Sequence, residues 1–524
     1  MAHLPIMFSW KKRIRYHSDP AKVFYQLCQG RTNTLLLESS AVRNYEKIES
    51  KLIVDSALRI TAINNIVTIQ ALSHNGSSLL PLLDSVVPSS MMVERTETRL
   101  NIRFLRHTIS TDEEHQRLIQ TSIFDCFRWI VQVIQGSLKE WKTLFLGGLF
   151  AYDLIHSFED VPKNNHPSPC PDICFYLAES VITINHQHKT AVIQAYSFSS
   201  KSSERNRLCA RIQQVDDCMR MNTFSIIPPA PLKKITVTTN INDIQYAHMI
   251  NQMRVFIAQG EVFQVVPSRQ FYCSCTHPLL TYRILKRNNP SPYMFFMQDK
   301  HFILFGASPE SYLKYDANHR IIALHPIAGT RSRGLHVNGS IDLDLDNRIE
   351  LSLRTNQKEL SEHLMLVDLA RNDLAKVCQY NSRHVSQLMA VEKYSHVMHL
   401  VSHVTGILRA DLDIFHAYQS CMNMGTLTGA PKLRAMQLIA QSEPVCRGSY
   451  GGSVGYFTGD GSFDACIVIR SAFVRDHRAT IQSGAGIVYD SVTTDEVLES
   501  TNKAQAVLQS IIHTHQRDRG KFYV

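Results

Sequence analysis

Residues 58–72, with the sequence LRITAINNIVTIQAL, have the pattern of two β-strands joined by a tight turn. The apolar segments 58–63 and 66–72 are rich in β-branched side chains, which favour strands. Asn64-Asn65 between them suits a two-residue hairpin, because asparagine tolerates the left-handed backbone that such turns require. The stretch therefore predicts an antiparallel strand pair.

The alternation of strands and turns extends outward from this hairpin. Segments 175–184 and 190–196 form a second predicted strand pair, and helices are expected near 121–135 and 203–221. The proline-rich stretch 226–231 then marks the best domain boundary, because consecutive prolines stiffen a linker. We predict an N-terminal domain over residues 1–227 and a C-terminal domain over residues 228–524.

Beyond this boundary, long helices are mixed with apolar strands and glycine-rich turns. Asn242 or Asp243 is expected to cap a helix that ends at Gly260, a residue type common just after helices. The whole pattern predicts an α+β fold in which helices cover large sheets.

The composition is that of a folded protein without a strong charge imbalance. Hydrophobic residues make up 44% and charged residues 19% of the 524 residues, which is enough for two or three domains. The net charge of +9 is spread without a long basic block. Nucleic acid is therefore not expected as a partner, whereas a small anionic substrate suits the mild positive balance.

Neither a membrane span nor a signal peptide is expected. The most apolar stretch, residues 143–155, is interrupted by two glycines and Asp153 and is too short to cross a bilayer. The N-terminus has no long apolar segment with a cleavage site. The 12 cysteines are scattered, so free thiols and a cytoplasmic location are expected.

Two pairs of glutamates occur at helical spacing in the C-terminal half. Glu359 and Glu362 lie on a predicted helix with apolar positions at Leu360, Leu364 and Val367. Thr493 and Glu496 match a capping box, so a second helix is expected to begin there, and Glu496, Glu499 and Lys503 form a stripe along it. Four such carboxylates can hold a hard divalent cation. Spaced glutamates are also common on ordinary solvated helix faces. The spacing alone favours that simpler interpretation.

Arg470 ends an otherwise apolar segment, 465–470, that is predicted as a strand. A buried arginine needs a partner, which is either a substrate carboxylate or an internal ion pair. The glycine-rich segments 448–452 and 483–486 flank this strand and allow backbone N–H groups to approach an anion. In segment 425–432, Pro431 is expected at the first position of a helix, which places Thr428 and Gly429 near an anion-binding helix N-terminus.

The three histidines at positions 396, 399 and 403 resemble a zinc triad only if the segment is helical. Alternating valines up to Gly406 favour a strand instead, on which His399 and His403 share one face and His396 points away. We therefore predict no three-histidine metal site, and we consider a single catalytic histidine.

Six segments, in a fixed order, carry a specific family resemblance. They are PIAGTR at 326–331, ELSEHLMLVDLARND at 359–373, MNMGTLTGAPK at 422–432, GSYGG at 448–452, IVIRS at 467–471 and SGAG at 483–486. Together they resemble the chorismate-binding enzyme family. LLLES at 35–39 and NPSPYMFF at 289–296 are similar to the feedback-site segments of its anthranilate synthase large-subunit branch. The resemblance covers nearly the whole chain and implies large, mostly antiparallel sheets packed as a sandwich, with helices on the outside.

Two positions distinguish the branches of this family. This chain has Ala328 where aminodeoxychorismate synthases have a nucleophilic lysine, and Gln264 where isochorismate-forming relatives have a water-activating lysine. Both absences suit ammonia, which is itself the nucleophile. The resemblance thus implies a lyase that converts chorismate and ammonia to anthranilate and pyruvate, through aminodeoxyisochorismate, as the first committed step of tryptophan biosynthesis.

The resemblance also implies a magnesium site and a substrate site. Glu362 and Glu499 would bind Mg²⁺, with Glu359 and Glu496 in support. Arg470 and Tyr450 would bind the enolpyruvyl carboxylate of chorismate. The full set of implied substrate-binding residues is Gly329, Thr330, Tyr450, Arg470, Gly484, Ala485, Gly486 and Lys503.

Three residues are implied in catalysis. Glu310 is the candidate general acid for the departing ring hydroxyl, and Thr426 belongs to the same catalytic set. His399 is the candidate acid that protonates the pyruvate methylene. His396 and His403 receive no role.

The family further implies a partner and an inhibitor. A separate glutamine amidotransferase subunit would supply ammonia, in a heterotetramer. Tryptophan would act as feedback inhibitor on Glu38, Ser39, Pro292, Tyr293 and Met294. Two other functions stay open at this point: an aminodeoxyisochorismate synthase that stops before pyruvate loss, and a non-catalytic tryptophan-sensing subunit.

Overall fold

The computed structural model describes residues 7–39, 48–105, 114–164, 166–221, 235–336, 340–394 and 397–516. The hairpin predicted from residues 58–72 is present: β3 (Glu49–Ile63) pairs antiparallel with β4 (Ile66–Ala71). Asn64 in the turn has a φ of 53°, as the turn requires. β3 is much longer than predicted, because its N-terminal half pairs with other strands.

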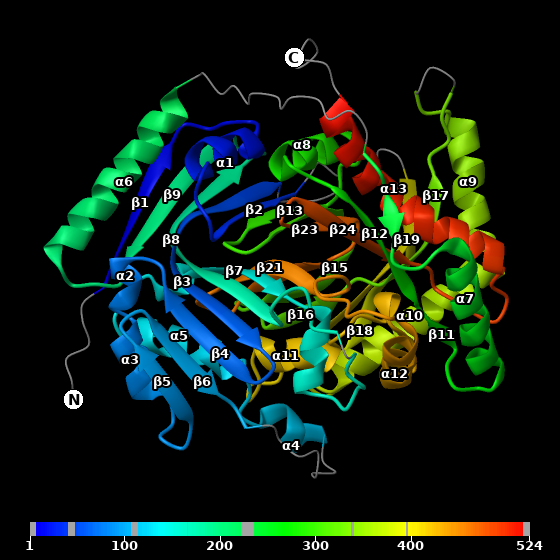
Figure 1. Ribbon diagram of the computed structural model, residues 1–524, viewed down its shortest axis with the longest axis horizontal. Helices are drawn as coiled ribbons and strands as arrows, with labels where there is room; N and C mark the ends of the chain where they lie inside the picture. Colours follow the sequence, from blue (N-terminus) through cyan, green and yellow to red (C-terminus); the bar gives the residue numbers. More distant parts are fainter. Residues whose placement is uncertain are drawn as a thin grey trace.

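One sheet contains the N-terminal half of β3 and the C-terminal half of β8 (Ile173–Asn185) at its centre (Figure 1). All its strand pairs are antiparallel. On one side of this centre, β9 (Thr190–Ser197) and β1 (Phe8–Ile14) follow. On the other side the order is β2 (Thr34–Glu38), β13 (Tyr293–Gln298), β14 (Ile303–Ser308), β23 (Ser471–Arg475), β24 (Arg478–Gly484), β12 (Ser268–Ser274) and β10 (Thr238–Thr239).

A second antiparallel sheet contains the other halves of β3 and β8. Beyond β3 lie β4, β6 (Arg99–Arg103) and β5 (Met92–Thr96). Beyond β8 lie β7 (Phe145–Phe150), β21 (Ser453–Thr458), β22 (Phe463–Ile467), β15 (Ser311–Asp316), β16 (Ile321–Leu324), β19 (Val397–Ile407), and then β17 (Ile327–Ser332) and β18 (His384–Lys393), which both pair with β19.

The two sheets are joined at two places into one closed network. At the first, β3 and β8 pass from one sheet to the other through register shifts between Ile53 and Leu58. At the second, β14 continues as β15 and β22 continues as β23. A small separate sheet pairs β11 (Gln264–Val265) with β20 (Gly429–Ala430).

The sheets pack face to face, as the predicted sandwich requires. Gly147 of β7 lies against Leu35 and Ile53 of the other sheet, and a Cβ at this glycine would lie 2.5 Å from Leu35 Cδ2. The close approach of the sheets therefore depends on the missing side chain. Leu35 belongs to this inner core, whereas its neighbour Leu36 faces the outer helices, as strand alternation dictates.

Helices cover the outer faces, which confirms the predicted α+β arrangement (Figure 1). The outer face of the first sheet shares one core with α1 (Pro20–Cys28), α6 (Ser202–Arg220), α8 (Pro278–Asn288) and α13 (Thr493–Gln516). The second sheet is packed by α5 (Asp125–Gln135), α10 (Gln357–Ala375) and α11 (Ile414–Cys421). The remaining helices are α2 (His74–Ser77), α3 (Leu80–Val86), α4 (Glu114–Ile119), α7 (Asp243–Ala258), α9 (Leu343–Thr355) and α12 (Lys432–Ser442). None of the helices in the described ranges is long and apolar enough to cross a membrane.

The predicted boundary after residue 227 lies within residues 222–234, outside the described residues, so the two-domain division stays a prediction. Strands from both sides of the boundary pair with each other. β2 pairs with β13, and β7 pairs with β21.

The predicted helix ends in the C-terminal half are confirmed in some places and wrong in others. Asn242 caps α7 in a full capping box, and Gly260 has the expected positive φ of 80°. α13 begins at Thr493, but the capping box is wrong: Thr493 donates to Asn251, and Glu496 accepts from Ser491 instead. Pro431 precedes the first residue of α12 rather than occupying it.

A buried ion pair holds the second sheet against the end of β13. Arg59 of β3 donates through Nε and Nη2 to Asp299, over 2.8 Å and 3.0 Å. Tyr176 of β8 donates to the same carboxylate over 2.7 Å. Both charged side chains are buried. Removing either one would leave the other as an uncompensated buried charge, which would destabilise the fold.

We expect Arg59→Met to lower the free energy of unfolding by about 3–5 kcal/mol, because it leaves the Asp299 carboxylate buried without its cation. The control is Arg95→Met, which removes an exposed pair with Asp84 and should cost less than about 1 kcal/mol. Thermal and urea unfolding of the two variants measure the difference, and equal losses would contradict the prediction.

Candidate active site

The candidate site is centred on the second junction between the sheets, where two neighbouring strands break together. β14 ends at Ser308 and β15 begins at Ser311, while β22 ends at Ile467 and β23 begins at Ser471. Across the break, Ile467 N–H donates to the Glu310 carbonyl and Ala307 N–H donates to the Arg470 carbonyl, both over 3.1 Å. The break thus fixes Glu310 and Arg470, both predicted site residues, on neighbouring segments.

The sequence predicted that Arg470 is the last residue of a strand, and this prediction is wrong. Arg470 follows the end of β22 and has a φ of 49°, in the left-handed region. This turn re-aims the chain between the two sheets, so the departure from strand geometry is part of the junction.

Glu310 is buried, and its Oε1 atom has no hydrogen-bond partner in the described part of the chain. Burial raises the pKa of Glu310 to about 7, against the opposing effects of the Thr426 hydroxyl and the Lys503 ammonium. Thr426 lies on the short helix Gly425–Leu427, and Lys503 lies on α13. The carboxyl group can therefore carry a proton near neutral pH, as a general acid must.

Arg470 has no carboxylate within ion-pair distance among the described residues. Burial lowers the pKa of its guanidinium, and the charges of Glu499 and Tyr450 act in the opposite direction. Tyr450 is itself buried, and the backbone N–H of Gly484 hydrogen-bonds its hydroxyl. A desolvated guanidinium without a partner is a binding group for an anion from outside the chain.

The four predicted glutamates come from α10 and α13 and lie near one another. Burial raises the pKa of Glu362 to about 7, and the charges of Glu359, Glu496 and Glu499 raise it further against the effect of Lys358. Glu362 Oε1 is buried without a hydrogen-bond donor, with Lys358 Nζ at 3.8 Å. Glu362 is therefore half-buried beside other carboxylates with one oxygen fully buried, which is not how a solvated face behaves.

The other three glutamates already have partners. Arg331 donates to Glu359 over 2.8 Å, Ser491 donates to Glu496 over 2.7 Å, and Lys503 lies 2.7 Å from Glu499. In the described ranges, no three histidine, cysteine or acidic side chains converge as a metal cage. The arrangement thus offers two pairs of carboxylates rather than a four-carboxylate site.

His399 lies on β19 within a row of side chains that crosses three strands. It pairs in register with Thr330 of β17 on one side and with Glu392 of β18 on the other. Thr330 Oγ1 lies 2.8 Å from His399 Nδ1. Burial, followed by the charge of Arg470, lowers the pKa of His399 to about 4, against Glu392 and the Gly329 backbone. The imidazole is therefore neutral at pH 7 in the ligand-free protein.

The predicted strand is present in this segment. His399 and His403 both lie on β19, and His403 Nε2 is 3.7 Å from Glu392 Oε1. His396 lies outside the described residues.

The glycine segments line the same region, but part of their backbone is already engaged. Gly484 N–H hydrogen-bonds Tyr450, and Ala485 N–H donates to the Tyr246 hydroxyl over 3.3 Å. Lys503 donates to the Gly484 carbonyl over 3.1 Å. A Cβ at Gly486 would lie 2.6 Å from the Gln264 amide nitrogen, so this glycine leaves room for Gln264.

Gly329 serves a similar purpose beside the glutamates. It has a φ of 70°, and a Cβ there would lie 2.8 Å from Glu359 Oε2. Gly329 of β17, a predicted substrate residue, therefore lies close to Glu359 of α10.

The predicted feedback segments also meet. Glu38 of β2 pairs in register with Met294 of β13. The buried Glu38 carboxylate accepts a hydrogen bond from Tyr282 over 2.6 Å and forms an ion pair with Lys286. Sequence reasoning missed Tyr282 and Lys286, because they come from α8 and are brought to β2 only by the fold.

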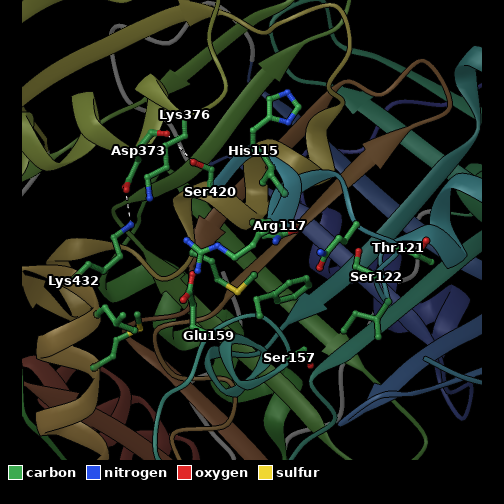
Figure 2. A pocket seen from close by; sticks show the side chains of 18 of the residues that line it. His115, Arg117, Thr121, Ser122, Ser157, Glu159, Asp373, Lys376, Ser420 and Lys432 are labelled. Carbon is green, nitrogen blue, oxygen red and sulfur yellow. Dashed lines mark hydrogen bonds and ion pairs between the residues drawn. The ribbon is translucent and has the colours of Figure 1, made fainter. Parts of the chain in front are cut away.

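A separate cavity of about 600 Å³ opens at the far end of α10 (Figure 2). Lys432 and Asp373 face each other there over 2.7 Å, and Arg117 and Glu159 line the opposite side. The cavity contains none of the predicted site residues, so the chemistry described above lies elsewhere.

Comparison with known proteins agrees with this geometry. The family model described as chorismate binding enzyme matches residues 89–509. The chain therefore belongs to the chorismate-binding enzyme family, which confirms the resemblance drawn from the six motifs.

Within the chorismate-binding enzyme family, the chain is most informatively compared with proteins about half identical to it. The chain is 52% identical over 503 residues to anthranilate synthase component 1 of Buchnera aphidicola subsp. Baizongia pistaciae, covering 96% of both chains. It is 51% identical to the Escherichia coli (strain K12) protein of the same name, covering 95% of this chain and 96% of the relative.

Solved structures share the fold. Anthranilate synthase component I from Streptococcus pneumoniae TIGR4 superposes with a TM-score of 0.66 at 26% identity, covering 89% of this chain and 93% of that one. The menaquinone-specific isochorismate synthase of Escherichia coli has a TM-score of 0.68 at 17% identity, covering 97% and 95%. The second likeness supports the fold alone.

The opposite situations of two arginines, the buried Arg447 and the half-buried Arg470, give a stability test. Arg447 is satisfied by Glu443 and by the carbonyls of Leu427 and Val266, whereas Arg470 has no such partner set. We expect Arg447→Met to lower the free energy of unfolding by about 3–5 kcal/mol and Arg470→Met to leave it unchanged or raise it. Thermal unfolding of the ligand-free variants measures both, and a similar loss in the two would contradict the assignment.

Proposed function

We propose that this chain is the chorismate-converting component of an anthranilate synthase, which adds ammonia to chorismate and then releases pyruvate. The observation that carries the proposal is the strand break, where a protonatable Glu310 with an unpartnered oxygen and Arg470 lie on neighbouring segments. The names of relatives about half identical to this chain agree with it. Ala328 and Gln264, in place of two lysines, favour ammonia over a covalent or water-derived nucleophile.

The first half-reaction replaces the ring hydroxyl of chorismate. Glu310 donates its proton to the departing oxygen, which leaves as water, while ammonia forms the new C–N bond at ring carbon two; the new ammonium group then loses one proton, which restores the acid. The raised pKa of about 7 keeps Glu310 protonated for this task. Thr426, whose hydroxyl opposes the rise in the pKa of Glu310, is the residue proposed to orient the carboxyl.

Arg470 and Tyr450 are the proposed ligands of the enolpyruvyl carboxylate. The guanidinium is desolvated and unpaired, so an incoming carboxylate supplies the partner that the protein lacks. Gly329, Thr330 and the Gly484–Gly486 backbone would enclose the ring, and Lys503 links that backbone to Glu499.

The second half-reaction needs no external proton. Aromatisation releases the hydrogen on ring carbon two, and the enolpyruvyl methylene gains one hydrogen to become the methyl group of pyruvate. A neutral His399 can accept the first proton and deliver it to the methylene, so its lowered pKa of about 4 fits a shuttle. This refines the role inferred from sequence, in which His399 was an acid from the outset.

Magnesium is the proposed cofactor. Glu362 and Glu499 would hold it, with Glu359 and Glu496 in support, because Mg²⁺ takes few protein carboxylates and keeps several waters. The unpartnered Glu362 Oε1 and its raised pKa beside three carboxylates fit a bound dication. When bound, the ion would supply positive charge for the ring carboxylate of chorismate.

The proposal includes a glutamine amidotransferase partner that supplies ammonia in a heterotetramer, and a cytoplasmic location. All 12 cysteines are free thiols, as a reducing compartment requires. Burial raises the pKa of Cys126, Cys174 and Cys466 well above the ordinary range, which makes them poor nucleophiles for releasing ammonia from glutamine.

Tryptophan is the proposed feedback inhibitor, bound at Glu38, Ser39, Pro292, Tyr293 and Met294. The Glu38 carboxylate already binds the ammonium of Lys286, so an amino acid ammonium group would compete at the same position. Tyr293 and Met294 begin a strand whose side chains are mostly apolar, which suits an indole.

Fluorescence of anthranilate, measured with chorismate, an ammonium salt and Mg²⁺, tests the activity directly. We expect product that disappears with a chelator and is not formed from free glutamine. Glu362→Gln should lower the rate at limiting Mg²⁺ by more than about 100-fold, and Glu359→Gln by about tenfold to 100-fold, because a supporting group costs less than a ligand.

Several results would contradict these expectations. Absence of fluorescence from folded protein would overturn the function, and accumulation of the amino-enolpyruvyl intermediate in the unaltered protein would favour an aminodeoxyisochorismate synthase. A larger loss for Glu359→Gln than for Glu362→Gln would reverse the assignment of ligand and support.

Ser39→Phe should raise the tryptophan concentration for half-inhibition by at least about tenfold, because the ring would fill the site and remove roughly 1.4 kcal/mol or more of binding. The rate without tryptophan should stay close to that of the unaltered protein. Ser90→Phe, at an exposed turn, is the control. Unchanged inhibition in Ser39→Phe would exclude this site.

A further inference from the structure

An acidic residue outside the predicted site lies in the same row as the candidate proton shuttle. Thr330, His399 and Glu392 are paired in register across β17, β19 and β18. Directly opposed residues of antiparallel strands project from the same face of the sheet, so the three side chains lie side by side. Thr330 contacts His399 Nδ1 at 2.8 Å, and Glu392 flanks the ring from the other strand.

Glu392 is held in place by groups that do not belong to the reaction. Tyr394 donates its hydroxyl to Glu392 Oε2 over 2.7 Å, and His403 Nε2 lies 3.7 Å from Oε1. The His403 ring in turn meets His325 edge to face, with centroids 4.5 Å apart. These contacts lower the pKa of Glu392, so that its carboxylate is ionised beside His399.

The surroundings of His399 contain opposing charges. Arg470 disfavours a positively charged ring, whereas Glu392 favours it. The Tyr394 ring packs against His399 with centroids 5.3 Å apart, so one side chain touches both the histidine and the carboxylate. Glu392 is therefore the acidic group in this row that can offset Arg470.

We propose that Glu392, held by Tyr394, is a positioning residue for His399 in the pyruvate-releasing half-reaction. Its carboxylate stabilises the imidazolium that exists while His399 carries the proton from ring carbon two to the enolpyruvyl methylene. The proton leaves carbon two, the C–O bond to the enolpyruvyl group breaks, and the methylene takes up the same proton, so no other reactant is needed. This inference rests on the proposed function and adds a residue to it.

Glu392→Gln removes the charge and keeps the shape, so it separates the two half-reactions. We expect chorismate consumption with ammonium to stay within about twofold of the unaltered protein, because Glu310 and Arg470 are untouched. The ratio of anthranilate to amino-enolpyruvyl intermediate should fall by at least about tenfold, since proton transfer by a positioned group contributes factors of this size or larger. Chromatography of the quenched reaction measures both products.

Matched variants test whether charge or structure is responsible. Glu392→Asp retains the carboxylate and should restore most of the product ratio. Tyr394→Phe removes only the 2.7 Å hydrogen bond and should shift the ratio in the same direction by a smaller factor. Glu350→Gln is the control. Glu350 of α9 binds Lys393, the neighbour of Glu392 on β18, but it is not in the row with His399.

The outcomes separate this inference from the function on which it rests. If the unaltered protein forms no anthranilate, the proposed function fails. If it does, but Glu392→Gln slows both half-reactions equally or leaves the product ratio unchanged, the role of Glu392 is refuted. Should Glu392→Gln not fold, an unchanged ratio in Tyr394→Phe would refute it, and a shifted ratio would support it.

Discussion

Two backbone hydrogen bonds across a strand break hold together the segments that carry Glu310 and Arg470, two residues of the proposed active site. They join Ile467 to Glu310 and Ala307 to Arg470, at the point where a strand pair leaves one sheet and enters the other. A residue in a continuous strand must project from one face of its sheet, but a residue in the break is released from that alternation. The break therefore frees an acid and a cation on neighbouring segments from strand alternation, while backbone hydrogen bonds hold the two segments together.

The same region contains charged groups that the protein leaves incompletely satisfied. Glu310 has an unpartnered oxygen, Arg470 has no ion pair among the described residues, and Glu362 is half-buried beside other carboxylates. Such groups destabilise the ligand-free fold, and their clustering is typical of a binding site. Other buried charges are paired, as at Arg59 with Asp299 and at Arg447 with Glu443.

Sequence periodicity predicted the hairpin, α7, α10, α13 and the histidine strand, because each depends on local pattern. It failed where tertiary contacts decide. Leu364, one of the apolar positions that indicated α10, is 49% exposed, whereas His363 is buried against Ser402. Arg470 looked like the end of a strand, since the break depends on pairing with distant residues. Glu392 carried no signal of its own, and only the register of β18 with β19 places it beside His399.

The proposed feedback segments and Arg470, the proposed substrate-binding cation, are linked along one row of backbone pairs in the first sheet. Glu38 pairs with Met294, Met294 pairs with Ala307, and Ala307 donates to the Arg470 carbonyl. Backbone hydrogen bonds join these antiparallel strands. One residue of the row therefore cannot move away from its neighbours without breaking hydrogen bonds between the strands. A ligand at Glu38 can therefore change the position of Arg470 only if β13 and β14 have two arrangements that the ligand binds unequally. Because the Ala307 N–H donates to the Arg470 carbonyl, a displacement of β14 would be passed to Arg470 through this hydrogen bond.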